Sequence, residues 1–159
     1  MAPKTTRATQ ALDRAGLRYS LHTYDYDPGA PRIGLQAAEA LGVPPSRVLK
    51  TLMASVDGRT VCLLVASDRE VSMKRVAAAF SGKSAAMLKP ADAERLTGYH
   101  VGGISPLGQK RSVPTAIDAG SLGEPTAEIH VNGGGRGLQI RLTEGDLVTA
   151  LAALVLPLT

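Results

Sequence analysis

A glycine-rich stretch, GYHVGGISPLGQK at residues 98–110, has the residue types most suggestive of chemistry. Gly102 and Gly103 let a main chain approach a ligand closely because no Cβ intervenes. Ser105 and Pro106 define the turn that follows, and two cationic residues come directly behind it. Such loops are typical of sites that bind an anion, or an oxygen that acquires negative charge. A sharp connection between two elements explains the same composition, so composition alone leaves both interpretations open.

Lys50 is the second candidate, because it lies in VLKTLMASV, an apolar run that alternates like a strand. In a strand it shares one face with four apolar residues, Val48, Leu52, Ala54 and Val56. An unpaired ammonium on that face would lose hydration. Two interpretations fit equally well. Lys50 either lies at a strand end and extends to solvent, or borders a cleft and meets an anionic ligand, with the hydroxyl of Thr51 nearby.

Two glycine-rich segments resemble nucleotide-binding motifs but do not match them. GISPLGQK has Gln109 directly after its second glycine, where a P-loop has lysine. Pro106 also removes an N–H that a phosphate cradle would use. NGGGRGLQ has Leu138 where a dinucleotide-binding turn has its third glycine. A hairpin turn is the simpler interpretation of the second segment, and we predict no nucleotide cofactor.

Metal and thiol chemistry are not indicated either. His22, His100 and His130 are far apart, with no cysteine or carboxylate at ligand spacing. We therefore predict no metal and no cofactor. Cys62 is the one cysteine and lies in an apolar run, where the residue usually packs as a small hydrophobe. A single cysteine also cannot form an intrachain disulfide.

Charge and composition favour a polyanionic partner. The formal net charge is +4 and the isoelectric point about 9.5, with basic residues spread along the chain. This distribution fits RNA better than a DNA-reading module. One Phe and no Trp argue against a stacking platform for single strands. The first ten residues lack the apolar core of a signal peptide, and no apolar run is long enough to cross a bilayer. We expect a cytoplasmic protein with no membrane or DNA partner.

The elements that must position these residues mix helices with adjacent strands. Capping and stop residues predict helices at residues 6–15, 35–41, 73–80 and 90–98, and one after Thr143. Alternation predicts strands at residues 18–24, 47–56, 59–67, 115–118, 127–132 and 137–142, with hairpin turns at Asp57-Gly58 and at 133–135. Because regular βαβ alternation is missing, we predict one α+β domain over residues 1–159, with a mixed, mostly antiparallel sheet.

Five stretches together resemble the YbaK/EbsC family of aminoacyl-tRNA deacylases, which are free-standing relatives of the editing domain of bacterial prolyl-tRNA synthetases. They are HTYDYDP from His22, VLKTL from Val48, TGYHVGGISPLGQK from Thr97, PTAIDA from Pro114 and GGGRGLQI from Gly133. Only GGISPLGQK is distinctive alone, but the order and spacing of the five are specific and span nearly the whole chain. The resemblance implies a curled sheet around a small pocket.

The resemblance also implies a reaction, release of a wrong amino acid from the acceptor end of aminoacyl-tRNA, principally cysteine from Cys-tRNA(Pro). Prolyl-tRNA synthetase is the protein partner that it suggests. It makes Lys50 the central catalytic residue, facing a loop that contains Gly102, Gly103 and Ser105. The residues that it would place in the substrate pocket are Tyr24, Ile33, Thr51, Pro106, Asn132 and Gln139.

Three positions depart from the family pattern. Ile33 stands where an aromatic residue is common, Asn132 where serine is expected, and Gln139 where aspartate is expected. These changes argue against a carboxylate base and leave the preferred amino acid open, with alanine as the alternative to cysteine. They also motivate a second hypothesis, a noncatalytic protein that binds tRNA or a synthetase. For the catalytic hypothesis, attack by water and attack by the substrate's own thiol are both compatible with the sequence.

Overall fold

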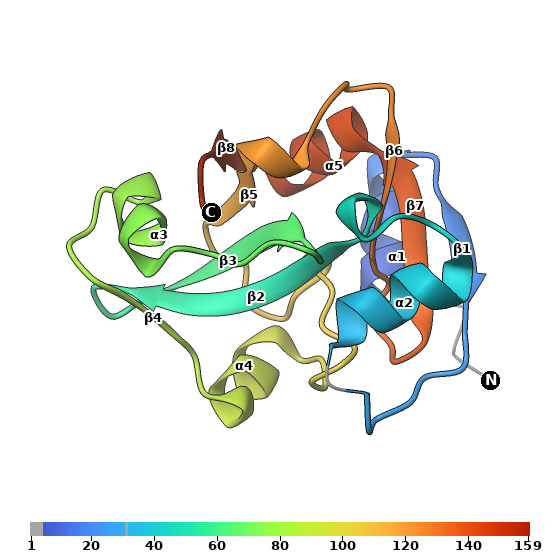
Figure 1. The fold of residues 1–159 in the computed structure, drawn as a ribbon, viewed down its shortest axis with the longest axis horizontal. Coiled ribbons are helices and arrows are strands. Elements are labelled where there is room, and N and C mark those ends of the chain that lie inside the picture. The colour runs from blue at the N-terminus through green and yellow to red at the C-terminus, as the bar shows by residue number, and fades with distance from the viewer. Residues whose placement is uncertain (1–4, 31) are drawn as a thin grey trace.

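Two β-sheets organise the chain in the computed structural model, which describes residues 5–30 and 32–159 (Figure 1). The larger is a mixed sheet in the order β4-β2-β3-β5-β8, with bounds Ala85–Met87, Leu49–Val56, Arg59–Ala66, Thr115–Asp118 and Leu154–Leu156. The smaller is an antiparallel sheet in the order β1-β7-β6, with bounds Ser20–Thr23, Leu138–Thr143 and Glu128–Asn132. The predicted α+β class with mixed, largely antiparallel pairing is confirmed.

The β2–β3 hairpin forms the centre of the larger sheet, because its turn has the backbone geometry that antiparallel pairing of the two strands requires. Asp57 and Gly58 both have positive φ, 50° and 84°, as an Asp-Gly hairpin turn requires. The two strands pair antiparallel along their full length. Residues 61–66 of β3 are all buried, so the sheet carries apolar packing on each face. The hairpin is therefore the rigid element on which the rest of the sheet is built.

The sequence pattern does not predict the two edge strands, β4 and β8. β4 pairs antiparallel with residues 54–56 of β2, and β8 pairs parallel with β5. Each has three residues, too few for alternation to be recognisable, and tertiary neighbours decide such pairings. β8 follows α5 (Glu144–Leu151), where Ala152 adopts a left-handed conformation with φ 48° and ends the helix.

The small sheet has one apolar and one polar face. Its apolar side chains, Ile129, Val131, Ile140 and Leu142, join the main core, in which α1 (Arg7–Ala15) packs. α2 (Ile33–Leu41) covers the opposite face, so the sheet lies between the two helices (Figure 1). By alternation that second face carries His22, His130 and Gln139. An isolated parallel bridge between Val48 and His130 joins the two sheets.

Local capping chemistry sets the predicted helix starts. The Thr6 hydroxyl accepts the Thr9 N–H (3.2 Å) at the start of α1. The Ser72 hydroxyl accepts the Arg75 N–H (3.3 Å) at the start of α3 (Met73–Ala79). α3 begins directly after its predicted cap, Ser72, and α1 begins one residue after the predicted start at Thr6.

α4 (Pro90–Thr97) begins at a proline and ends at Gly98, as predicted. α2 begins at Ile33, two residues before its predicted start at Leu35. Its N-cap, Arg32, makes no side-chain capping bond, so the usual start signal is missing. Within residues 5–30 and 32–159, no helix combines the length and the apolar character needed to cross a bilayer.

A buried carboxylate ties the end of the chain to the larger sheet. Asp118 is 1% exposed and accepts hydrogen bonds from the Leu158 N–H (3.0 Å), the Ser121 hydroxyl (2.8 Å) and Arg69 (2.9 Å). Ser121 belongs to the short 3-10 helix η2 (Ala119–Ser121), and a second one, η1 (Pro45–Arg47), precedes β2. Burial alone would raise the pKa of Asp118, but these hydrogen bonds and the arginine lower it below the ordinary value of 3.8.

Replacing Asp118 with asparagine should lower the free energy of unfolding by roughly 2 kcal/mol at neutral pH, because charge-assisted hydrogen bonds are lost. A carboxyl whose pKa is lower in the folded state stabilises above its unfolded pKa. The difference between the two proteins should therefore shrink as the pH falls below 3.8. Urea unfolding at neutral and acid pH measures this. The control Asp92→Asn, on exposed α4, should change stability by less than about 0.5 kcal/mol, and a pH-independent difference for Asp118 would contradict the prediction.

Candidate functional site

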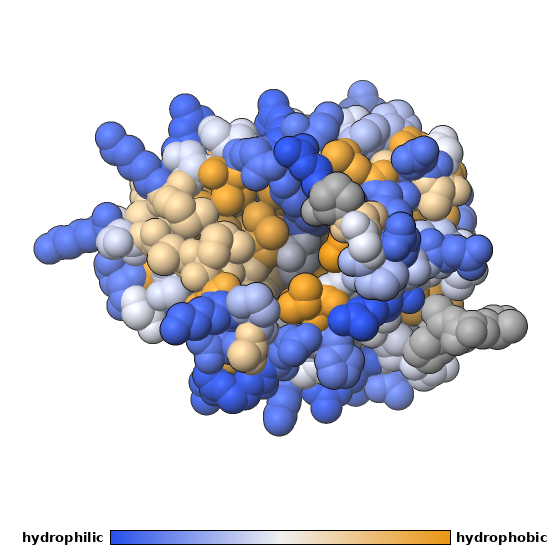
Figure 2. All heavy atoms as spheres, turned by 60° about the horizontal axis from the view of Figure 1, so that its bottom comes forward, coloured by the Kyte–Doolittle hydropathy of each residue, from blue (hydrophilic) through white to orange (hydrophobic). Residues whose placement is uncertain are grey.

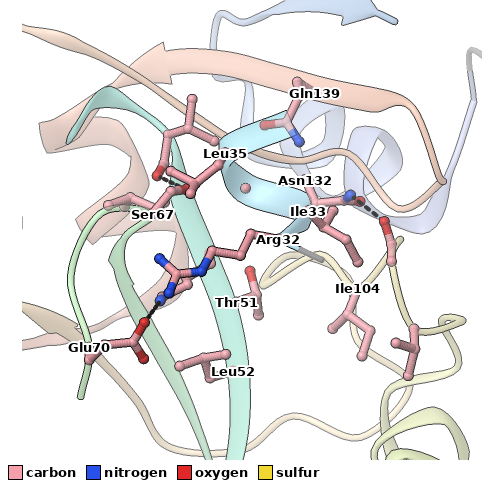
Figure 3. Close-up of a pocket in the computed structure, with 16 residues that line it drawn as sticks. Arg32, Ile33, Leu35, Thr51, Leu52, Ser67, Glu70, Ile104, Asn132 and Gln139 are labelled. Atoms are coloured by element: carbon pink, nitrogen blue, oxygen red, sulfur yellow. Dashed lines mark hydrogen bonds and ion pairs between the residues drawn. The ribbon is translucent and has the colours of Figure 1, made fainter. Parts of the chain in front are cut away.

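A cavity of about 340 Å³ opens where the two sheets and α2 meet. Its wall comes from the first turn of α2, the beginning of β2, the segment after β3, the loop after α4, and the facing ends of β6 and β7. Figure 2 shows a hollow in one face of the molecule with apolar side chains along its border, and Figure 3 shows how the cavity residues lie. The sequence-predicted residues that the structure brings together in this wall are Ile33, Lys50, Thr51, Gly102, Asn132 and Gln139.

The cavity opens beside β2 because that strand is paired unevenly. On one edge β3 pairs with the whole of β2, but on the other edge β4 reaches only residues 54–56. The Val48–His130 bridge closes the beginning of that second edge. In the described part of the chain, no strand pairs with residues 50–52 on this edge. All three residues of this segment line the cavity.

Lys50 lies in this gap. Its Nζ is 3.4 Å from Glu70 Oε1, and the two side chains are 21% and 77% exposed. An ion pair with such an exposed partner contributes only about 0.2–1 kcal/mol, which does not explain a lysine among apolar residues. Arg32 also lines the cavity and extends across it toward Glu70 (Figure 3). The lining thus carries two cations and one carboxylate, an arrangement suited to an anionic ligand.

Gly102 is the glycine of the loop that borders the cavity. Its φ is +92°, and a Cβ at this position would collide with the Tyr26 hydroxyl, so a side chain does not fit. Gly103 is not in the cavity wall; it donates its N–H to the His100 carbonyl oxygen (2.8 Å). The structure therefore leaves Gly102, rather than the glycine pair, in contact with the space that Lys50 borders.

Three further residues that the resemblance assigns to the site lie outside the cavity wall. Ser105 is fully buried, and its hydroxyl accepts the Leu107 N–H (3.2 Å). Pro106 lines a different hollow, beside α1. Tyr24 packs against the apolar cluster of Ala37, Ala38 and Val48. Burial raises the pKa of Tyr24 above its ordinary value of 10, so its hydroxyl stays protonated behind the wall.

Asn132 and Gln139 are cross-strand neighbours in the β6–β7 ladder and face the cavity together (Figure 3). Asn132 Oδ1 accepts two N–H groups of the following turn (2.7 and 3.3 Å), and Nδ2 donates to the Gly102 carbonyl oxygen (3.3 Å). Gln139 is 3% exposed, and its Oε1 has no hydrogen-bond partner among the described residues. The buried Thr51 hydroxyl also has no hydrogen-bond partner among the described residues. Because an unpartnered buried polar atom costs about 1–3 kcal/mol, both atoms are suited to a polar ligand.

Two histidines that are far apart in the sequence meet on the polar face of the small sheet. The rings of His22 and His130 lie edge to face, with centroids 5.5 Å apart. Burial, together with the neighbouring charge of His22, lowers the pKa of His130 to about 4. His130 is therefore neutral near pH 7, and its Nδ1 has no partner in the described chain. The sequence offers no signal for this contact, because it depends on the pairing of β1 with β7 and of β7 with β6.

The buried thiol is poorly placed for chemistry. Burial raises the pKa of Cys62 to about 12, so the thiol stays protonated. No group of three or more His, Cys, Asp and Glu side chains gathers as possible metal ligands within the residues described. The groups that the cavity offers to a ligand are the Lys50 ammonium, the Arg32 guanidinium and the main chain at Gly102. Arg32 and Glu70 carry no sequence motif, and only their place beside the gap in β2 identifies them.

A family model for the aminoacyl-tRNA editing domain matches residues 28–150. The chain is 36% identical over 107 residues to EbsC of Enterococcus faecalis, a proposed Cys-tRNA(Pro)/Cys-tRNA(Cys) deacylase, and the match covers 66% of this chain and 63% of that protein. It is 33% identical over 96 residues to a proline–tRNA ligase of Acidithiobacillus ferrooxidans, covering 60% of this chain and 17% of the ligase. The match thus spans less than two thirds of either relative.

Solved structures share the fold. A proposed trans-editing enzyme for prolyl-tRNA synthetase superposes with a TM-score of 0.80 over 96% of this chain and 94% of that one, at 24% identity. A hypothetical protein, APE2540, gives a TM-score of 0.84 over 96% and 99% of the two chains, at 22% identity. At these identities the likeness establishes the α+β architecture and its mixed sheets.

Replacing Gly102 with alanine should lower the free energy of unfolding by about 1–3 kcal/mol, because a Cβ at φ +92° is strained and meets Tyr26. Gly123→Ala is a matched control, since nothing lies within 4 Å of a Cβ there. It should be neutral or stabilise by up to about 1 kcal/mol. Urea unfolding of the two variants measures both changes. Equal stabilities would show that position 102 accepts a side chain.

Proposed function

The chain belongs to the aminoacyl-tRNA editing domain family, and from this membership we propose that it is an aminoacyl-tRNA deacylase, which releases a wrongly attached amino acid from tRNA. We propose Cys-tRNA(Pro) as its first substrate, because EbsC, the relative with 36% identity, bears that assignment. The observation that carries the proposal is the shared cavity: Lys50 and Gly102 border one space of about 340 Å³, within the usual size range of small-ligand sites.

Lys50 and Arg32 bind the anionic end of the tRNA in this proposal. An aminoacyl-tRNA ends in a phosphodiester and a ribose that carries the amino acid as an activated ester. Among the described residues that line the cavity, the exposed Glu70 is the one carboxylate beside these two cations. A hydrogen bond between an ammonium and a phosphate oxygen contributes about 1.5–3 kcal/mol. This hydrogen bond holds the ester in a productive orientation, which removes much of the entropic cost of the reaction.

The Gly102 N–H is the proposed donor to the oxyanion. When the ester carbonyl is attacked, its oxygen becomes negative, and one preorganised N–H stabilises it by about 3 kcal/mol. The N–H of Gly103 is already bonded to the His100 carbonyl oxygen. Gly102 is thus the member of the glycine pair that both lines the cavity and has an N–H without a partner in the described chain.

The nucleophile need not come from the protein. In hydrolysis, a water oxygen bonds to the carbonyl carbon, the ester C–O bond breaks, and the ribose oxygen takes a proton. A cysteinyl substrate can instead attack with its own sulfur. The C–S bond then forms as the ester C–O bond breaks, the ribose oxygen takes the proton that the thiol loses, and a cyclic thioester leaves the tRNA. Both routes use the same contacts to Lys50 and Gly102. Cys62 serves neither, because it is fully buried with a pKa of about 12.

We propose prolyl-tRNA synthetase as a partner, because the 96 matching residues form part of a proline–tRNA ligase. A second candidate function is a tRNA-binding protein without turnover. Gln139 favours it, because this buried residue presents a neutral amide to the cavity at a position where a carboxylate could act as a base.

Lys50→Ala should lower kcat/KM for release of cysteine from Cys-tRNA(Pro) by roughly 10- to 100-fold. This range corresponds to the loss of one charge-assisted hydrogen bond to the substrate. Folding should survive, because the lost ion pair has a 77% exposed partner. Lys74→Ala removes the same charge from the exposed surface of α3 and is the matched control. It should keep kcat/KM within about twofold. An unchanged value for Lys50→Ala would remove Lys50 from the site.

If the substrate thiol is the nucleophile, the protein should release cysteine from tRNA(Pro) at least about tenfold faster than alanine or proline. Alanine and proline have no thiol, and their esters depend on water. Release of labelled amino acid from the three charged tRNAs measures the rates, and mass spectrometry separates free cysteine from a cyclic product. Equal rates for cysteine and alanine would indicate hydrolysis. Stable esters of all three, with measurable tRNA binding, would instead support the binding protein without turnover.

A further inference from the structure

We propose that Arg136 is a positioning residue that directs the Gly102 N–H into the cavity. This inference rests on the proposed function, which gives that N–H its role. Arg136 belongs to the turn between β6 and β7 and lies outside the cavity wall. Its Nε donates to the Val101 carbonyl oxygen at 3.0 Å, although the residue is exposed to solvent. An arginine can therefore act on the loop after α4 without contacting the ligand.

Through the peptide bond between Val101 and Gly102, this hydrogen bond also sets the orientation of the Gly102 N–H. The bond is trans, so the Gly102 N–H and the Val101 carbonyl point in opposite directions. Arg136 holds the carbonyl, and the N–H is therefore turned away from Arg136. Gly102 lines the cavity whereas Arg136 does not. In the proposed arrangement, the direction away from Arg136 is therefore the cavity side.

The remaining polar groups of this loop already have partners. The Val101 N–H donates to Glu94 Oε2 (2.8 Å), the Gly102 carbonyl accepts from Asn132 (3.3 Å), and the Gly103 N–H donates to the His100 carbonyl (2.8 Å). From the Val101 N–H to the Gly103 N–H, only the Gly102 N–H has no partner within residues 5–30 and 32–159. The hydrogen bonds of the described residues thus leave the Gly102 N–H of this loop available to a ligand.

Two further contacts fix Arg136 itself. Its guanidinium carbon lies over the Tyr26 ring, 5.6 Å from the centroid, in a cation–π arrangement. The turn and the loop also touch through their main chains, since a Cβ on Gly103 would lie 2.9 Å from the Arg136 nitrogen and from the Gly135 carbonyl carbon. Asn132 bonds the Gly102 carbonyl from one side of this contact, and Arg136 bonds the Val101 carbonyl at its exposed edge.

The test compares Arg136→Ala and Arg136→Lys with Arg59→Ala, which removes the same charge at the β2–β3 turn, far along β2 from Lys50. In single-turnover release from the best charged tRNA, the rate constant at saturating enzyme should fall about tenfold for Arg136→Ala. The half-saturating concentration should stay within about twofold. Arg136→Lys should remain slow, because lysine lacks the planar fork that contacts both Val101 and Tyr26. Arg59→Ala should match the wild type.

A tRNA phosphate contact predicts a different pattern: a higher half-saturating concentration, an unchanged rate constant, and full rescue by lysine. That pattern would overturn the positioning role. Amide hydrogen exchange supplies a readout that needs no turnover. Protection of the Gly103 N–H should fall about tenfold in Arg136→Ala and not in Arg59→Ala, because the loop loses a fixed contact. Unchanged protection overturns the inference whatever the rate. A wild-type protein that releases nothing from any charged tRNA overturns the proposed function instead.

Discussion

The uneven pairing of β2 is the constraint on which the rest of the site depends. β3 pairs with every residue of β2, whereas the other edge is occupied only near its two ends, by the Val48–His130 bridge and by β4. Complete pairing would leave no space beside Lys50. A wholly open edge would expose a strand to association with other chains. The short gap holds Lys50 and Thr51, whose side chains leave opposite faces of the sheet. Because the cavity lies at the unpaired edge of the strand, both residues line it, one with a cation and the other with a hydroxyl.

The two sides of the cavity are supported in different ways. The cationic side is held loosely, since Lys50 has a single long contact with an exposed carboxylate and Arg32 extends from the N-terminal end of α2. The main-chain side is held tightly, because Asn132 and the turn after β6 fix the loop around Gly102. This division suits the proposed substrate. Attraction of a polyanion requires charge and reach, whereas stabilisation of a developing oxyanion requires a donor with a fixed direction.

Local chemistry made much of the fold predictable from the sequence. The Asp57-Gly58 turn, the Ser72 cap and the Pro90 start are each determined by residues within a few positions, and the structure confirms them. The division into two sheets and the strands β4 and β8 depend on distant partners, which alternation does not reveal. The site shows the same limit. Strand alternation placed Lys50 on an apolar face, but composition did not distinguish Gly102 from Gly103, because a hydrogen bond to His100 separates their roles. Arg136 had no chemical signature of its own, since its importance comes from a backbone contact.

The first turn of α2 has a consequence for how this protein can diverge. Ile33 and Leu35 line the cavity, yet neither belongs to the buried clusters that stabilise the fold; α2 is anchored one turn later by Ala37 and Ala38. Substitution at the two positions should therefore reshape the cavity, which is the acyl-binding space of the proposed function, without disturbing strand register or core packing. In the proposed deacylase, one helical turn can therefore alter the preferred amino acid at little cost to the free energy of unfolding.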